Sequence, residues 1–411
     1  MRAAWESENC RYHTKAPSLC RRAVVLIFSN SLKAKVRPRI ALVTSGIGTR
    51  HGGIGVVAQL IVSSLEEYSD LTVWEHHAFW PRFARIPAAV ARTFLGSLKT
   101  PDFVLYDHVD LAILHAVIPR LQTIPYAVFL HGIEVWKPLV GRRREALLGA
   151  NLLLVNSATT ELEARIFNPW LPKVEVIWLG VARQNEIAHA GFNPPVGLIV
   201  GRMADSERLK GHDAVMDAWP LIRSMIPDAK LMIVGSGNDT SRLQKRVKAE
   251  RLVGIEFCGR IDDAQRDQMY RSSRLLFYPS KQEGFGLAGV EAASFGVPLL
   301  GLAGTVTEEL FPTGTGAVIA KDLSRESIAE AAVPVLRSAQ HAAELGRAAA
   351  ARVNAVFLKE HFGDRFRRAL APLLFSYVAV ATNTPSTDLR KRKTSASAQV
   401  ASSESRQSWP R

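Results

Sequence analysis

The sequence predicts an α/β protein made of two doubly wound domains. At 411 residues the chain is too long for one ordinary domain, and its 47% hydrophobic residues suffice for two cores. Apolar runs typical of buried strands alternate with helical patterns on both sides of a polar, irregular stretch that closes with Pro194-Pro195. We therefore expect domains at residues 38–182 and 196–359, joined by a linker at 183–195.

Residues 275–301 form the clearest unit of this pattern. The run 275–280 predicts a buried strand, 287–295 has the length and alanine content of a short helix, and 297–301 predicts the next strand. Gly284 and Gly286 stand in the turn from strand to helix. Such a turn lets backbone amides approach a ligand, and the helix N-terminus that follows favours phosphate.

Glu283 and Glu291 bracket this predicted helix. If the helix ran through both, they would lie about 12 Å apart on nearly one face, roughly the span from the sugar to the ribose of a nucleotide sugar. One carboxylate would then accept hydrogen bonds from sugar hydroxyls and the other from ribose hydroxyls. For this pair alone, an amphipathic helix with a solvated glutamate at each end is the alternative.

The two glutamates, with seven residues between them and Gly284-Phe285-Gly286 after the first, resemble the signature of family-four retaining glycosyltransferases of the GT-B fold. The resemblance covers roughly residues 38–375. It implies two facing Rossmann-like domains with the ligand cleft between them, and a terminal helix at 360–377 that returns to the first domain. It further implies a donor-binding set in the second domain: Glu283, Gly284, Phe285, Gly286 and Leu287 at the sugar, and Glu291 at the ribose.

In the first domain, an apolar run at 40–43 predicts the first buried strand. A loop with five glycines follows, and residues 54–68 have helical spacing. A glycine-rich loop between strand and helix is a ligand cradle, although such loops also serve only for tight packing. By resemblance, Gly52 and Gly53 face the donor phosphates and the acceptor. Further strands are predicted at residues 71–73, 103–106, 126–130, 152–157 and 174–180.

His131 directly follows the strand predicted at 126–130. That position lies at the edge of the sheet where parallel sheets bind ligands, although a histidine there can also simply cap the strand. His131-Gly132 followed by Glu134 matches a motif of the resembled family, whose histidine binds the donor sugar near the reacting centre. We therefore expect His131 to reach the donor from the first domain.

The second domain opens with a strand at 197–201 and places Arg202 just past its end, with Lys210 a short distance on. Two cations over a crevice fit a diphosphate, whose charge grows as the glycosidic bond breaks, although two surface cations are the alternative. The resembled family uses such a pair, often closer together, so Arg208 competes with Lys210 for the second role.

The strand and helix pattern continues to the end of this domain. Strands are predicted at 230–234 and 255–259, and helices from 241, over 260–270, over 324–336 and over 360–374. By resemblance, Ile261 meets the base of the nucleotide through its backbone. Residues 304–309 predict another turn on the crevice side.

The net charge of +14 is concentrated at the two ends of the chain. Residues 1–37 show no sustained period, and 378–411 are rich in Ser, Thr, Ala and Arg, so we expect a basic extension and a disordered basic tail. Basic ends can bind nucleic acid or an anionic membrane surface, or remain solvated. Three cysteines form neither a disulfide framework nor a zinc spacing, and no run of 18 apolar residues occurs.

The combined prediction is a retaining hexosyltransferase that uses a nucleoside-diphosphate sugar and a saccharide or lipid-linked hydroxyl acceptor, in polysaccharide or glycolipid biosynthesis. His131, Glu283, Arg202 and Lys210 are its expected catalytic set. The resemblance implies no metal or other cofactor. We expect the protein in the cytoplasm, with peripheral contact at the inner membrane face as a further hypothesis.

Three alternatives remain at this stage. A GT-B sugar-nucleotide epimerase or a sugar phosphorylase would use similar ligand cradles. A Rossmann dehydrogenase is disfavoured because the glycines after the first strand lack the Gly-x-Gly-x-x-Gly spacing. A nucleic-acid binder is disfavoured because the chain between its basic ends is nearly neutral and has no stripe of aromatic and basic residues.

Overall fold

The computed structural model describes residues 37–48, 52–76, 82–184 and 193–383. The expected basic extension therefore lies almost wholly outside the described residues, as do most of the expected tail and the middle of the linker. Asn193 and Pro194 close the linker through a cis peptide bond.

The described residues form two six-stranded parallel sheets, one in each half of the chain, which confirms the predicted α/β architecture. The order in the first sheet is β2-β1-β3-β4-β5-β6. Its strands are β1 (Arg39–Thr44), β2 (Asp70–Glu75), β3 (Phe103–Tyr106), β4 (Tyr126–Leu130), β5 (Leu152–Val155) and β6 (Val174–Val176). Its helices are α3 (Gly52–Leu65), α4 (Arg82–Ser97), α5 (Val109–Val117), α6 (Arg142–Leu148) and α7 (Ala158–Phe167).

The second sheet has the order β12-β11-β10-β7-β8-β9. Its strands are β7 (Val196–Val200), β8 (Lys230–Val234), β9 (Ile255–Gly259), β10 (Leu275–Phe277), β11 (Leu299–Leu302) and β12 (Ala317–Ala320). Its helices are the 3₁₀ helix η2 (Asp205–Lys210), α8 (His212–Met225), α9 (Thr240–Ala249), α10 (Asp263–Ser272), α11 (Leu287–Ser294), α12 (Val306–Leu310) and α13 (Arg325–Arg337).

Each sheet has a switch point, where the strand order reverses: the strands that follow its first strand lie on both sides of that strand. β1 lies between β2 and β3 in the first sheet, and β7 lies between β8 and β10 in the second. Ligands of open parallel sheets bind outside the carboxyl ends of the strands at such points. The topology therefore places a crevice at the ends of β1 and β3 and another at the ends of β7 and β10.

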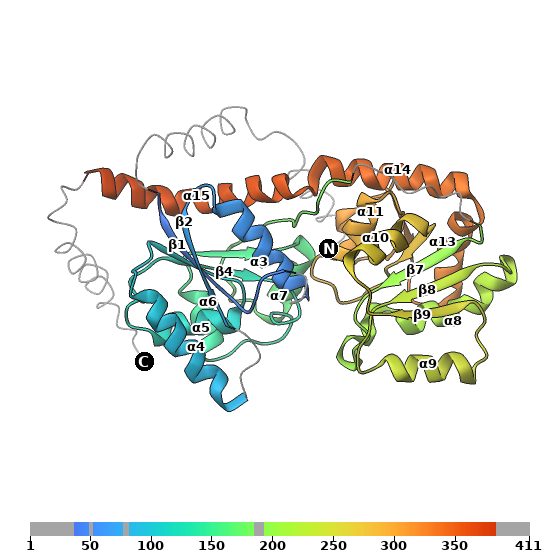
Figure 1. Ribbon diagram of the computed structural model, residues 1–411, viewed down its shortest axis with the longest axis horizontal. Helices are drawn as coiled ribbons and strands as arrows, with labels where there is room; N and C mark the ends of the chain where they lie inside the picture. Colours follow the sequence, from blue (N-terminus) through green and yellow to red (C-terminus); the bar gives the residue numbers. More distant parts are fainter. Residues whose placement is uncertain (1–36, 49–51, 77–81, 185–192, 384–411) are drawn as a thin grey trace, which may run out of the picture.

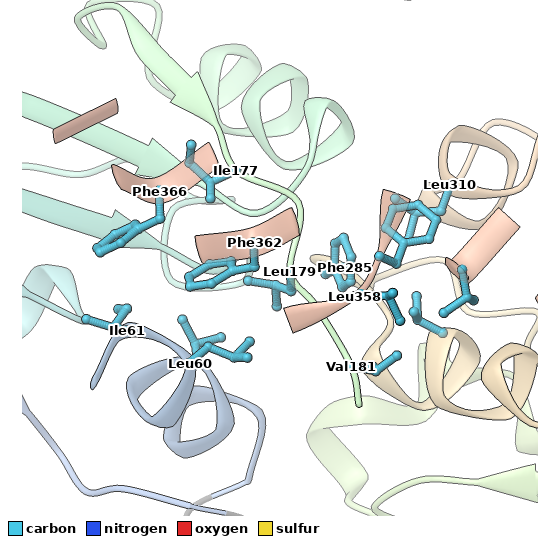
Figure 2. Close-up of a cluster of buried hydrophobic side chains, with 14 of the residues drawn as sticks. Leu60, Ile61, Ile177, Leu179, Val181, Phe285, Leu310, Leu358, Phe362 and Phe366 are labelled. Carbon is cyan, nitrogen blue, oxygen red and sulfur yellow. The ribbon is translucent and has the colours of Figure 1, made fainter. Parts of the chain in front are cut away.

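Two long helices, one after the other, lead the chain from the second half back to the first (Figure 1). α14 (Ala339–Val356) runs along the second half, and α15 (Lys359–Asn383) returns over the first half, where it packs on α3. One buried apolar cluster follows this path through both halves, from Leu60 and Phe362 to Phe285 and Leu310 (Figure 2). Because each buried side chain of this size contributes about 1.5–3 kcal/mol, the cluster stabilises the junction of the halves.

Some boundaries differ from the sequence-based expectation. Gly52 and Gly53 begin helix α3, so these two glycines belong to its first turn and not to the loop. The segment expected as a turn at 304–309 contains the short helix α12. Helix α14 has no counterpart in the prediction, and α15 continues to Asn383, six residues into the expected tail.

Candidate active site

A cavity of about 310 Å³ lies between the two halves. The first half contributes the start of α3 and the residues that follow β4 and β5, and the second half contributes the ends of β7 and β10 and the start of α11. Eight of the predicted site residues line the cavity: Gly53, His131, Lys210, Glu283, Gly284, Phe285, Gly286 and Leu287. The other four lie outside its lining: Gly52, Arg202, Ile261 and Glu291.

His131 is fixed in one orientation at the end of β4. Its Nε2 lies 2.6 Å from the backbone oxygen of Asp107, and its ring stacks on Phe129 with centroids 5.2 Å apart. Burial lowers the pKa of His131, so the ring is neutral at pH 7. Because a carbonyl oxygen only accepts, Nε2 carries the hydrogen and Nδ1 offers a lone pair.

The turn after β10 touches the end of β4 backbone to backbone. A Cβ built on Gly284 would lie 1.8 Å from the backbone oxygen of His131, so no other residue fits at this position without separating the halves. Gly132 has φ +147°, and a Cβ there would lie 3.3 Å from the Cα of Gly284. The two glycines therefore allow the motifs of the two halves to meet.

The turn after β10 also sets where helix α11 begins. Gly286 is the N-cap residue with φ +88°, a conformation that favours glycine, and the helix begins at Leu287. The ring of Phe285 packs edge-on against Phe357 in the core, at 5.9 Å between centroids. Phe285 therefore lines the cavity and anchors the turn with its side chain.

One helix does not run through both glutamates, so the separation inferred on that condition is wrong. Glu283 lies in the turn, and only Glu291 lies on α11. Each carboxylate instead has a tyrosine beside it, of which Tyr270 is buried and Tyr278 partly buried. Tyr278 shares a hydrogen bond with Glu283, and the Tyr270 hydroxyl lies 3.4 Å from Glu291 Oε2. Burial raises the pKa of Glu291, and Arg266, 3.9 Å away, opposes that rise.

The two predicted cations, Arg202 and Lys210, share one acidic partner. Both pair with the side chain of Glu207 in η2, Lys210 Nζ at 3.0 Å from Oε2. Burial acts against ionisation of Glu207, but the hydrogen bond from Arg202 and the charge of Lys210 hold its pKa below the usual range. The Arg202 side chain is 68% exposed, and Gly201 before it lines the cavity.

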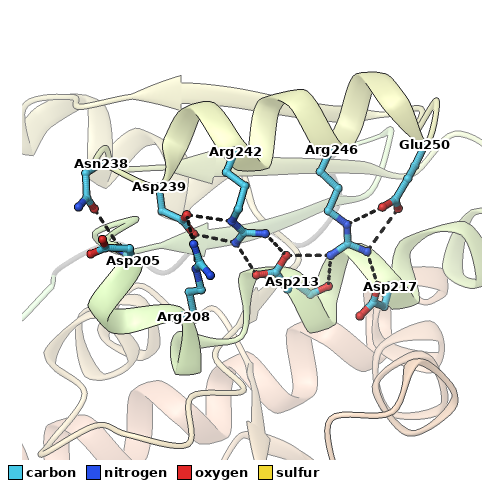
Figure 3. A network of polar contacts seen from close by, with 9 residues as sticks. All are labelled: Asp205, Arg208, Asp213, Asp217, Asn238, Asp239, Arg242, Arg246 and Glu250. Carbon is cyan, nitrogen blue, oxygen red and sulfur yellow. Dashed lines mark hydrogen bonds and ion pairs between the residues drawn. The ribbon is translucent and has the colours of Figure 1, made fainter.

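Arg208 points to a different set of groups. Its guanidinium pairs with Asp239 at 3.0 Å, and Asp239 also binds Arg242, which continues the network to Asp213 (Figure 3). Arg208 does not line the cavity. Of the two competing cations, Lys210 is therefore the one that the fold directs to it.

The sequence reasoning missed three polar residues in the lining. Among the described residues, His212 Nε2, Ser280 Oγ and Asn156 Oδ1 are buried without a hydrogen-bond partner. Burial, and next the charge of Lys210, lower the pKa of His212 to about 4, so this ring is neutral at pH 7. The available signal was their positions: His212 directly follows Gly211, Asn156 directly follows β5, and Ser280 lies in the loop after β10. Strand ends and loop-to-helix joints line such crevices.

Comparison with known proteins relates this site to a family. Residues 184–352 match the model of the glycosyl transferases group 1. This match covers most of the second half of the chain. The chain is 28% identical over 169 residues to a GDP-mannose-dependent phosphatidylinositol monomannoside mannosyltransferase of Corynebacterium glutamicum, which covers 39% of this chain and 44% of the relative. It is 31% identical over 176 residues to a glycogen synthase of Mycobacterium tuberculosis, covering 42% and 40%.

Solved structures show that the chain has the GT-B fold. A sucrose-phosphate synthase of Thermosynechococcus elongatus superimposes with a TM-score of 0.69 at 18% identity, covering 83% of this chain and all of the other. The Anabaena protein HepE in complex with UDP-glucose superimposes at 0.67 and 17%, covering 82% and all of the other. The curated relatives above are matched over less than half of their own length.

The described residues of the protein include neither a candidate membrane span nor a candidate metal cluster. None of its described helices is both long and apolar enough to cross a membrane. No three His, Cys, Asp or Glu side chains in the described ranges gather closely enough to hold a metal ion.

Proposed function

We propose that the protein is a retaining glycosyltransferase that moves a hexose-type sugar from a nucleoside-diphosphate sugar to a hydroxyl acceptor. The observation that carries this proposal is one cavity between the halves that combines Lys210, Glu283 and His131. A cation, a carboxylate and a neutral hydrogen-bond acceptor suit the diphosphate and the hydroxyls of such a donor.

The second half would hold the nucleotide. Arg202 and Lys210 would bind the diphosphate, with the start of α11 adding its unpaired amides. Glu291 would accept from the ribose hydroxyls and Ile261 would meet the base through its backbone. The exposed guanidinium of Arg202 and the cavity-lining Lys210 support this arrangement, since both keep donors beyond those used by Glu207.

The sugar would lie between the halves. Glu283 and the amides of Gly284 to Leu287 would hold its hydroxyls from one side, and the lone pair of His131 Nδ1 would accept from the other. Gly52 and Gly53 would allow close approach of the acceptor and the phosphates at the start of α3. Contact between the halves would exclude water, which would favour transfer over hydrolysis.

The reaction would exchange one bond at the anomeric carbon for another on the same face. As the bond between the anomeric carbon and the phosphate oxygen breaks, Arg202 and Lys210 would stabilise the charge that grows on the leaving diphosphate. The acceptor oxygen would form the new bond and pass its proton to the leaving phosphate. Positive side chains would serve where other transferases use a metal ion.

Calorimetric titration with UDP, GDP and ADP tests the donor site. We expect micromolar binding of one nucleotide, unchanged by EDTA and weakened at least tenfold by Glu291→Ala. Glu330→Ala, at an exposed position of α13, is the matched control and should bind like wild type. Absence of binding to all three nucleotides would overturn the proposal.

The acceptor is proposed to be a growing polysaccharide or a lipid-linked saccharide. The names of the relatives, one a glycolipid mannosyltransferase and one a glycogen synthase, support these two classes. Transfer of labelled sugar into either class, above the rate of donor hydrolysis, would separate them. An epimerase would convert the donor with no acceptor, and a phosphorylase would require inorganic phosphate.

A further inference from the structure

Glu309 joins the two halves at a point outside the cavity. From α12 in the second half, its carboxylate accepts hydrogen bonds from the backbone amides of Ala158 and Thr159 at 2.9 and 2.8 Å. It also accepts from the hydroxyl of Thr159 at 2.7 Å and from the indole of Trp178 at 2.9 Å. Four donors of the first half therefore converge on one side chain of the second.

The same end of α7 holds the turn of the candidate active site. The hydroxyls of Ser157 and Thr160 donate to the backbone oxygen of Gly284 at 2.5 and 3.0 Å. Ser157 is also the N-cap of α7, since its Oγ accepts from the amide of Thr160 at 3.0 Å. The first turn of α7 thus binds Glu309 with its amides and Gly284 with its hydroxyls.

We propose that Glu309 is a positioning residue that fixes α7 against the second half and thereby holds the Gly284 turn at the end of β4. This inference rests on the proposed function, because the turn carries Glu283, the expected sugar ligand. The connection runs from Glu309 to the first turn of α7, and from there through Ser157 and Thr160 to the oxygen of Gly284. Neither Glu309 nor α7 touches the cavity.

A carboxylate suits this position better than an amide. Both of its oxygens accept, and its charge complements the positive end of α7. In Glu309→Gln one oxygen becomes an N–H donor that faces backbone N–H groups or the indole. The substitution therefore breaks part of the contact while it keeps the size of the side chain.

The experiment compares Glu309→Gln with Glu308→Gln in the full-length chain. Glu308 is the matched control, because it accepts from the amide of Gly304 within the second half, at 2.7 Å. Three quantities are measured: nucleotide affinity by calorimetry, release of nucleoside diphosphate from UDP-glucose, GDP-mannose or ADP-glucose, and the emission of Trp178, identified by its loss in Trp178→Phe.

We expect Glu309→Gln to lower kcat at least tenfold, to change the Trp178 emission, and to leave nucleotide affinity within twofold of wild type. Nucleotide affinity is spared because the groups expected to bind it belong to the second half. Glu308→Gln should change none of the three. Thr160→Val, which removes one link to Gly284, should lower kcat in the same direction, and its effect combined with Glu309→Gln should be less than additive.

Two results would overturn the inference while leaving the proposed function standing. One is changed Trp178 emission with kcat within twofold of wild type, which would show that the contact is broken without consequence. The other is a parallel loss of nucleotide affinity and kcat, which would show general damage to the second half. Absence of nucleotide binding by wild type would instead overturn the proposed function, and this inference with it.

Discussion

The carboxyl ends of the two sheets approach the same cavity with different chemistry. In the first half, the ring of His131 forms a hydrogen bond with the backbone oxygen of Asp107, and the carboxyl group of Asp107 binds Thr44 Oγ1 at 2.5 Å. In the second half, Glu207 gathers Arg202 and Lys210 next to the turn that carries Glu283. Two sheets with switch points thus provide one buried, hydrogen-bonded edge and one charged edge.

This difference shows that two sheets of the same topology can bind different parts of one ligand. The charged edge can stabilise a diphosphate, which carries most of the charge of the proposed donor. The hydrogen-bonded edge suits neutral hydroxyl groups, and its neutral His131 adds no charge to the sugar end. The predictions below test the contact between the edges first, then the charged edge, and then the buried one.

Gly284→Ala should have the largest effect on donor turnover, because it separates the edges of the two sheets. The new Cβ would overlap the backbone oxygen of His131, so the turn must withdraw from β4. Since a shift of about 1 Å can cost about 100-fold in rate, we expect donor turnover to fall by about that factor or more. Nucleotide affinity, measured by calorimetry, should stay within a few-fold of wild type.

Gly289→Ala is the control for that substitution, since a Cβ there would meet only side-chain carbons of Leu299 and Tyr278 at 3.8 Å. It should retain most of the turnover. Full turnover in Gly284→Ala would mean that the close contact of the halves has no part in the reaction.

Lys210→Ala tests the charged edge. Loss of a charged hydrogen bond to the diphosphate costs about 1.5–3 kcal/mol, so the affinity for the nucleoside diphosphate should fall about 10- to 100-fold. Arg208→Ala is the matched control, because Arg208 pairs with Asp239 away from the cavity. Titration of both variants decides the assignment, and a larger loss in Arg208→Ala would reverse it.

Asp107→Asn tests the buried edge through the pH dependence of stability. Burial raises the pKa of Asp107 from 3.8 to about 7, so between these values the folded state holds a proton that the unfolded state releases. The contribution of Asp107 to the free energy of unfolding is therefore fully present below about pH 4 and is lost as pH rises through 7. The total change is up to about 4 kcal/mol.

Urea unfolding of wild type and Asp107→Asn from pH 4.5 to 8 measures this effect. The stability of wild type relative to the variant should decline with pH and level off above 7. His115 and His212, whose pKa values burial lowers to about 4, act in the opposite direction but are common to both proteins. A difference that does not vary with pH would contradict the assignment.

Local patterns determined the secondary structure well where segments are buried and apolar. β3, β4 and β8 have the predicted ends, because parallel strands covered on both faces read as continuous apolar runs. Ser157 is the N-cap of α7, since its side chain satisfies a free amide of the first turn. Helix α14 was missed because alanine-rich segments carry weak periodicity.

The sequence by itself determined two α/β halves, a glycine turn between strand and helix, and a set of residues of which eight line one cavity. Only the tertiary structure decided how these residues are held. Glu309 meets Thr159 across 150 residues of chain, and Gly284 must be glycine because a carbonyl from the other half occupies the space of its Cβ. Such contacts depend on how the halves pack, and no local periodicity or propensity records that packing.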